Sequence, residues 1–227
     1  MPTAPIMAVP PRASISSLIS FIQHHLRALL ADPVALHAAR RRCLALLAPR
    51  APRHRRRRRH DPPQASDEQG EDDDEKAVLT ALHGAIDAFL PPASGGDSAT
   101  CLAGVEEALQ APALLPEHGE TAGLDNRRVA ACAYFYLALV RCAQGDAWQM
   151  AMDLLQAVAV CPAAGEEGGG LAPRALWEGL FDEAVLARAG GEEDAARRAA
   201  RRYKDWLMYY KVVAAAPDAA GGVENGG

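Results

Sequence analysis

The chain has 227 residues, enough for one large or two small domains, and 49% of them are hydrophobic, which is enough to form a core. Aromatic residues make up 5%, and much of the apolar fraction is alanine, so close-packed helices are favoured over sheets. The net charge of -5 is small, and no apolar run approaches the ~20 residues that span a bilayer, so we expect no membrane partner. Runs of alternating β-branched residues, the usual sign of strands, are missing.

Residues 14–48 are predicted to form a helical hairpin. Ser14, Ser16 and Ser17 offer caps to a first helix, whose apolar residues recur every three or four positions. Asp32 followed by Pro33 predicts the start of a second helix, with a capping carboxylate and a proline at the first helical position.

Residues 49–73 are predicted to be a disordered linker that is first basic and then acidic. They contain PRAPRHRRRRRHDPPQ and then DEQGEDDD, with no apolar residue larger than alanine or proline. Such a segment cannot bury enough apolar surface to offset the entropy lost on folding.

Residues 74–213 are predicted to form one all-helical domain, followed by a disordered tail, 214–227. Its densest apolar stretch, Asp125 to Pro162, is predicted to be two antiparallel helices. Gly145 suits the end of the first helix, Asp146 suits the cap of the second, and Pro162 stops it. We expect the segment between Ala113 and Leu124 to be an irregular connection.

About eight helices in sequential antiparallel pairs indicate an all-α fold, either α-solenoid-like or an irregular bundle. The central pair supports the first form, because several of its residues fall at the offsets of a tetratricopeptide unit. No second copy at a fixed period is evident. The residues concerned are Tyr134, Leu137, Ala138, Gly145, Ala157 and Pro162.

No motif of catalysis, cofactor binding or metal binding is evident, so we predict no site of these three kinds. His24 and His25 point about 100° apart on a helix, which does not suit a shared metal ion. The carboxylate pairs Glu106-Glu107 and Asp182-Glu183 are expected on exposed helix faces. The five cysteines have no paired spacing and are expected to be buried and reduced.

Four aromatic residues leave two alternatives open: they could line a peptide-binding groove, or they could belong to the core. The four are Tyr134, Tyr136, Trp148 and Trp206. Along the last helix, Tyr203, Trp206, Leu207, Tyr210 and Val213 are expected to face inward, and Arg197, Arg198, Arg201, Arg202 and Lys204 to face outward.

The strongest charge feature is an arginine run within the predicted linker, Arg53 and Arg55 to Arg59. It could bind nucleic acid or an importin, and it contains no aromatic residue that could stack on bases. We expect a cytoplasmic or nuclear protein. An Arg-rich, Ser-bearing N-terminus leaves an organellar destination as the alternative.

Four segments of the chain begin SLISFIQHHL, LQAPALLPEH, LAPRALWEGL and ARRYKDWLMY. Together they resemble the N-terminal helical region of plant ubiquitin ligases of the LIN/Cerberus type. The resemblance covers nearly all of the chain except the charged linker and the tail. It implies a helical interaction region; the family's U-box, armadillo-like and WD40 parts have no counterpart in this sequence, so ligase activity is not implied.

We therefore expect a non-enzymatic interaction or scaffold module with unidentified protein partners, which could act as an adaptor in ubiquitination. The alternative is a basic-tract protein that binds nucleic acid or an importin through Arg53, Arg55, Arg56, Arg57, Arg58 and Arg59.

The alternative makes a quantitative prediction. If the arginine run engages about five or six phosphates, the log–log salt slope for duplex DNA should be roughly -4 to -5, because ~0.9 counterions are released per contact. Fluorescence anisotropy with labelled duplexes across a salt series measures the slope. Binding that persists at high salt, or that discriminates between sequences, would contradict a phosphate-driven interaction.

Overall fold

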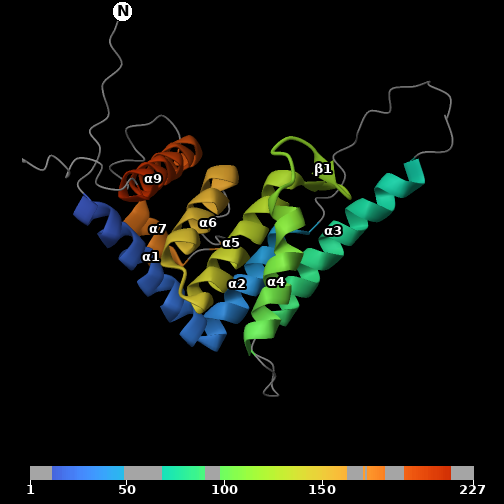
Figure 1. Ribbon diagram of the computed structural model, residues 1–227. Helices are drawn as coiled ribbons and strands as arrows, with labels where there is room; N and C mark the ends of the chain where they lie inside the picture. The colour runs from blue at the N-terminus through green and yellow to red at the C-terminus, as the bar shows by residue number, and fades with distance from the viewer. Residues whose placement is uncertain are drawn as a thin grey trace, which may run out of the picture.

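The computed structural model describes residues 12–48, 68–89, 98–162, 171, 173–181 and 192–215. These residues form eight α-helices and one two-stranded hairpin (Figure 1), so the predicted all-α fold is confirmed. The helices are α1 (Arg12–Ala31), α2 (Pro33–Leu46), α3 (Glu68–Ala88), α4 (Ser98–Ala113), α5 (Asn126–Gln144), α6 (Ala147–Val160), α7 (Arg174–Leu180) and α9 (Glu192–Ala215), and the strands are β1 (Glu120–Thr121) and β2 (Leu124–Asp125).

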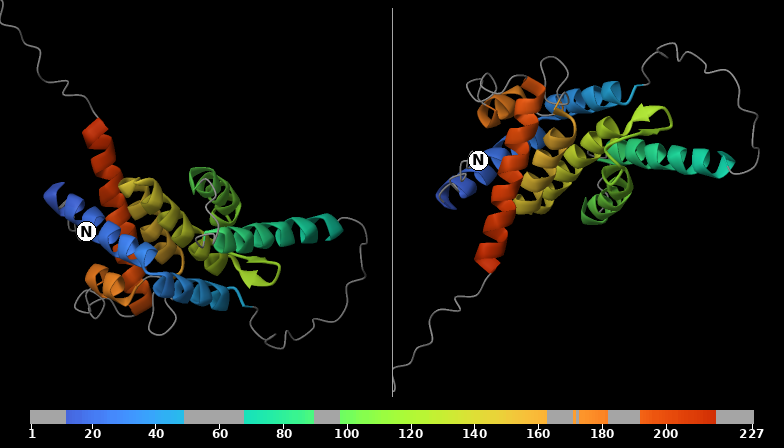
Figure 2. Two further views of the ribbon diagram at one scale, coloured as in Figure 1. Left: turned by 90° about the horizontal axis from the view of Figure 1, so that it is seen from below. Right: turned by 90° about the horizontal axis from the view of Figure 1, so that it is seen from above.

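Helix α5 is the centre of the fold. It packs against α6 on one side and α4 on the other, α3 packs against α4, and α9 packs against α6. Helix α1 crosses α5 and α6 from a further side, and α1, α2 and α7 lie together beside this row (Figure 2). An α-helix that is apolar around its whole circumference must be enclosed in this way.

Local capping follows the sequence predictions closely. The Asp32 carboxylate accepts hydrogen bonds from the backbone amides of Val34 and Ala35, at 2.9 and 3.2 Å, at the start of α2. The Asp146 carboxylate accepts one from the amide of Gln149 at 2.9 Å, at the start of α6. Between α5 and α6, Gly145 adopts a left-handed conformation with φ of 84°, which costs glycine little.

Three predicted boundaries are wrong. Helix α1 begins at Arg12, so Ser14, Ser16 and Ser17 lie inside the helix and do not cap it. Helix α3 begins at Glu68, inside the predicted linker 49–73, and α9 runs to Ala215, into the predicted tail 214–227. Acidic residues near a helix N-terminus are stabilised by the helix dipole, which is why the acidic half of the predicted linker can be helical. Residues 49–67, with the arginine run, lie outside the described residues.

The connection from Glu120 to Asp125 is a β-hairpin, where we expected irregular structure. Glu120 pairs with Asp125 and Thr121 with Leu124, and the two turn residues, Ala122 and Gly123, have φ of 48° and 78°. Positive φ at both positions is the geometry of a type I′ turn, which usually carries Asn-Gly or Asp-Gly. The amide of Ala122 donates a hydrogen bond to Glu75 Oε2 of α3 at 2.7 Å, so the unusual turn is tied to the helical body.

A single core cluster joins the segment before the linker to the rest of the chain. Cys132 of α5 lies beside α2, with its Sγ 3.8 Å from the carbonyl oxygen of Cys43. The guanidinium of Arg40 on α2 donates from Nε to Asp87 of α3 at 3.0 Å. The predicted hairpin 14–48 therefore shares its core with the predicted helical domain 74–213.

Helix α9 approaches α6 through small side chains. Ala195, Ala196, Ala199 and Ala200 are buried along one face, and Leu207 continues that face. Two side chains predicted to point outward are instead half-buried: Arg197, and Lys204, whose Nζ donates a hydrogen bond to Gln156 of α6. This burial lowers the pKa of the Lys204 amine, because desolvation disfavours its charged form.

Candidate functional site

The four aromatic residues singled out in the sequence do not share one groove. Tyr136 is 1% exposed and belongs to the core. Tyr134 and Trp148 are half-buried against the same core cluster. Trp206 lines a pocket in a different part of the fold.

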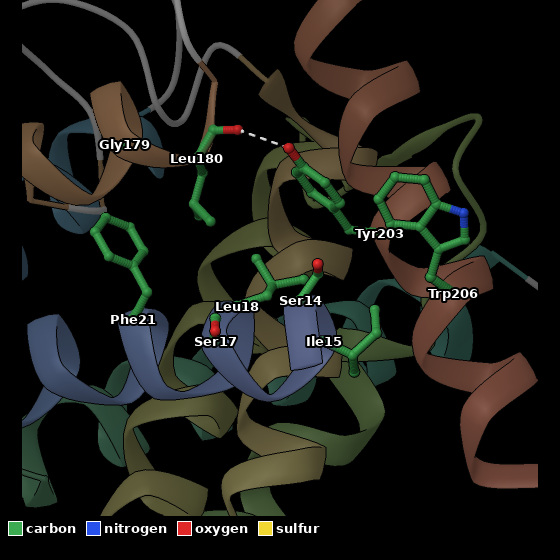
Figure 3. A pocket seen from close by; sticks show the side chains of 9 residues that line it. All are labelled: Ser14, Ile15, Ser17, Leu18, Phe21, Gly179, Leu180, Tyr203 and Trp206. Carbon is green, nitrogen blue, oxygen red and sulfur yellow. Dashed lines mark hydrogen bonds between the residues drawn. The ribbon is translucent and has the colours of Figure 1, made fainter. Parts of the chain in front are cut away.

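That pocket has a volume of about 270 Å³ and lies where α1, α7 and α9 meet (Figure 3). Helix α1 forms one wall with five residues, while α7 and α9 form the others. We call it the α1/α7/α9 pocket. Its lining residues are Ser14, Ile15, Ser17, Leu18, Phe21, Gly179, Leu180, Tyr203 and Trp206.

The aromatic wall of the pocket is held rigidly. The Tyr203 hydroxyl donates a hydrogen bond to the carbonyl oxygen of Leu180, the last residue of α7, at 3.2 Å. Burial raises the pKa of the Tyr203 phenol, which keeps the hydroxyl protonated as a donor. Ring contacts continue from Trp177 through Phe181 and Tyr203 to Trp206, with centroids 4.7, 6.4 and 5.5 Å apart. The pocket wall is therefore formed before any ligand arrives.

Gly179 allows α7 to approach α1 closely. A Cβ atom at this position would lie 2.2 Å from Phe21 Cζ, well inside contact distance. The Phe21 ring therefore covers the glycine backbone, and this contact fixes one edge of the pocket. A lone glycine within a helix among Trp177, Leu180 and Phe181 is a sequence signal of close approach that our sequence analysis missed.

The residues that line the pocket suit ligand binding rather than catalysis. Their side chains are mainly aliphatic and aromatic, with the hydroxyls of Ser14 and Ser17 on exposed positions at the rim. Among the nine lining residues, the Tyr203 phenol is the one ionisable group, and it is already committed to Leu180. A pocket of this composition recognises an apolar group and offers weak polar contacts at its edge.

The carboxylate and histidine pairs singled out in the sequence lie outside the α1/α7/α9 pocket or outside the described residues. Glu106 pairs with Arg141 of α5 at 2.7 Å and accepts a hydrogen bond from Gln144 at 2.8 Å, so it joins α4 to α5. His25 lies against Phe21, and the described residues contain no group of three potential metal ligands. Asp182 and Glu183 lie outside the described residues.

All five cysteines are free. Four of them are buried, as predicted, whereas Cys101 is exposed, against the prediction. Burial raises the pKa of the Cys132 thiol well above its usual range, and the nearby Cys43 adds to this effect. Such a thiol is a poor nucleophile, because the thiolate is the reactive form.

Asp153 of α6 is a buried carboxylate that the sequence analysis did not single out. It is 6% exposed and accepts a hydrogen bond from the Gln149 side chain at 2.9 Å. Desolvation raises its pKa from 3.8 to about 6, and the Gln149 hydrogen bond and Arg141 offset only part of this effect. Asp153 lies outside the α1/α7/α9 pocket and bears on stability.

Comparisons with known proteins add no relative: no protein-family model, no curated protein and no solved structure matches this chain. The resemblance to LIN-type ligases therefore stays a prediction. In the part of the chain that the structure describes, no helix combines the length and apolarity needed to cross a bilayer.

The surroundings of Asp153 predict a pH-dependent stability. Its raised pKa means that the folded state favours the protonated form, so stability is lost as pH rises through about 6. Asp153→Asn keeps the acceptor oxygen for Gln149 without the charge. We expect this variant to unfold with a free energy higher by roughly 2–3 kcal/mol at pH 8, from about 1.4 kcal/mol per pKa unit.

Urea unfolding of both proteins between pH 4 and pH 8 measures this difference. The two stabilities should converge as pH falls toward 4, where the carboxyl is neutral in the folded wild type. A gap that is constant over this range, or an Asn variant less stable at pH 8, would show that the charged carboxylate is well solvated or paired.

Proposed function

We propose that this chain is a non-enzymatic protein-interaction module that docks a partner through the α1/α7/α9 pocket. The observation that carries the proposal is the rigid, open, apolar pocket whose aromatic wall is fixed by Tyr203 and Leu180. Interfaces between proteins derive much of their affinity from an apolar or aromatic anchor that fills such a pocket.

Two features favour a protein partner over a small molecule. The volume of about 270 Å³ is slightly below the range of ~300–1,000 Å³ that is usual for small-ligand sites. The apolar surface also continues beyond the pocket, since Tyr209 on α9 is 50% exposed three residues after Trp206. A partner segment can cover both the pocket and this adjoining surface.

The resemblance to LIN-type ligases supports an adaptor role in ubiquitination for such a module. Buried, reduced thiols support a cytoplasmic or nuclear location. The second candidate function, nucleic-acid or importin binding through Arg53 and Arg55 to Arg59, rests on sequence alone.

An adaptor should not transfer ubiquitin by itself. We expect the purified chain, incubated with E1, a panel of E2 enzymes, ubiquitin and ATP, to show no self-ubiquitination above an E2-only control. The physical reason is that such ligases act by positioning a charged E2 on a dedicated docking surface, which the resemblance does not extend to. Chain formation by the purified protein would overturn the non-enzymatic assignment.

Filling the pocket should abolish docking without unfolding the protein. Ser14 is exposed and lines the pocket, so Ser14→Trp can place a large ring in it without leaving a cavity elsewhere. Ser16 is also exposed on α1 but does not line the pocket, which makes Ser16→Trp the matched control. A phage library of random 14-residue peptides, selected on the wild-type chain, supplies the binding probes.

Peptides recovered on the wild type should lose at least tenfold in affinity for Ser14→Trp and keep their affinity for Ser16→Trp. Fluorescence anisotropy gives the affinities, and thermal melting confirms that both variants are folded. The proposal fails if no peptide is recovered on the wild type, or if the two variants bind the recovered peptides equally.

A further inference from the structure

We infer that the segment that docks in the α1/α7/α9 pocket is an acidic helix, whose apolar anchor enters the pocket and whose carboxylate, one turn away, pairs with Arg202. The inference rests on the proposed function, since it names the chemistry of the partner at the same site. It follows from the position of Arg202, the charge of the outer face of α9 and the apolar surface beside the pocket.

Arg202 lies at the edge of the pocket by its register on α9. It stands four residues before Trp206, which lines the pocket. Residues four apart lie on the same face of a helix, one turn from each other. The positive charge of Arg202 also acts on the Tyr203 phenol, where it opposes the rise in pKa that burial causes.

The Arg202 side chain is exposed, and no carboxylate among the described residues is in ion-pair contact with it. Three other described arginines are paired with carboxylates within the fold: Arg40 with Asp87, Arg141 with Glu106, and Arg201 with Glu117. Arg202 thus has a guanidinium that can bind a carboxylate of a partner with two parallel hydrogen bonds.

The exposed side of α9 near the pocket is positive overall. Among the described side chains of α9, Arg198, Arg201, Arg202 and Lys211 are exposed, as is the carboxylate of Asp205, and Arg201 is already paired with Glu117. Asp205 is turned about 100° away from Trp206; it stands one turn after Arg202, but the two side chains form no ion pair. Glu178 precedes Gly179 on α7 and is turned from the pocket by the same angle. Complementary charge therefore favours an acidic partner over a basic one.

The partner must also cover more than one anchor position. Beyond Trp206, the half-exposed Tyr209 and the partly buried Tyr210 continue the apolar surface along α9, with their rings 5.3 Å apart. An amphipathic helix laid along this surface presents side chains at i, i+3, i+4 and i+7. On α9, Arg202 lies one helical turn from the pocket residue Trp206. A partner helix matches this spacing when its carboxylate lies three or four residues from the side chain that enters the pocket.

The test uses the full chain and the peptides recovered on the wild type. Arg202→Glu should weaken binding of those that carry a carboxylate three or four residues from the anchor by roughly tenfold, because attraction becomes repulsion. Arg41→Glu is the matched control, since Arg41 is exposed on α2, a helix that contributes nothing to the pocket. Replacing the peptide carboxylate with lysine should restore binding to Arg202→Glu and weaken binding to the wild type.

The outcomes separate the inference from the proposed function. Peptides that are sensitive to Ser14→Trp but equally bound by Arg202→Glu and Arg41→Glu would leave the pocket in place and overturn the acidic partner. Recovered peptides without acidic residues near the anchor would do the same. Failure to recover any pocket-dependent peptide would overturn both. Arg202→Ala, which removes the charge without reversing it, should give an intermediate loss.

Discussion

The whole structure depends on enclosing α5, because this helix carries apolar or small side chains around its full circumference. Val129, Cys132, Ala133, Leu139 and Val140 are among its residues with no exposed surface. A single partner helix covers one stripe, so α4, α6 and α1 must each cover a part of it. The other helices are then arranged by what remains apolar on these three: α3 packs on α4, and α9 packs on α6.

The α1/α7/α9 pocket is a consequence of this order. Helix α9 uses its buried alanines to approach α6, and its larger residues Tyr203 and Trp206 follow farther along the helix, where they line the pocket. Helix α1 is fixed on α5 and α6 by Ile22 and Leu26, so its N-terminal turns stand opposite those aromatic rings. The short α7 bridges the two through Gly179 against Phe21 and Leu180 against Tyr203. The space left between rigid helices is what a partner side chain can fill.

Local features were predictable from the sequence where one residue determines one backbone conformation. Asp32, Gly145 and Asp146 act as the sequence indicated, because capping depends on neighbours within four positions. The hairpin was missed because its strands are two residues long and its turn carries Ala122 where asparagine or aspartate is usual. The predicted start of α3 is too late in the sequence, because an acidic stretch without apolar residues shows no hydrophobic periodicity. The pocket could not be predicted, since its residues come from three segments that only tertiary packing brings together.

This origin of the pocket links binding to the integrity of the whole fold. Its walls belong to residues 14–21, 179–180 and 203–206. A fragment that contains the whole pocket must therefore extend from residue 14 to residue 206. The arginine-rich segment separates α2 from α3 in the sequence, but the core joins the two sides through Cys43 beside Cys132 and Arg40 beside Asp87. Loss of contact between α1 and the α5–α6 pair would remove one wall of the pocket while leaving Tyr203 and Trp206 in place. In the proposed function, partner binding would therefore depend directly on the packing of α1, and a bound helix that touches both α1 and α9 would in turn stabilise that packing by mass action.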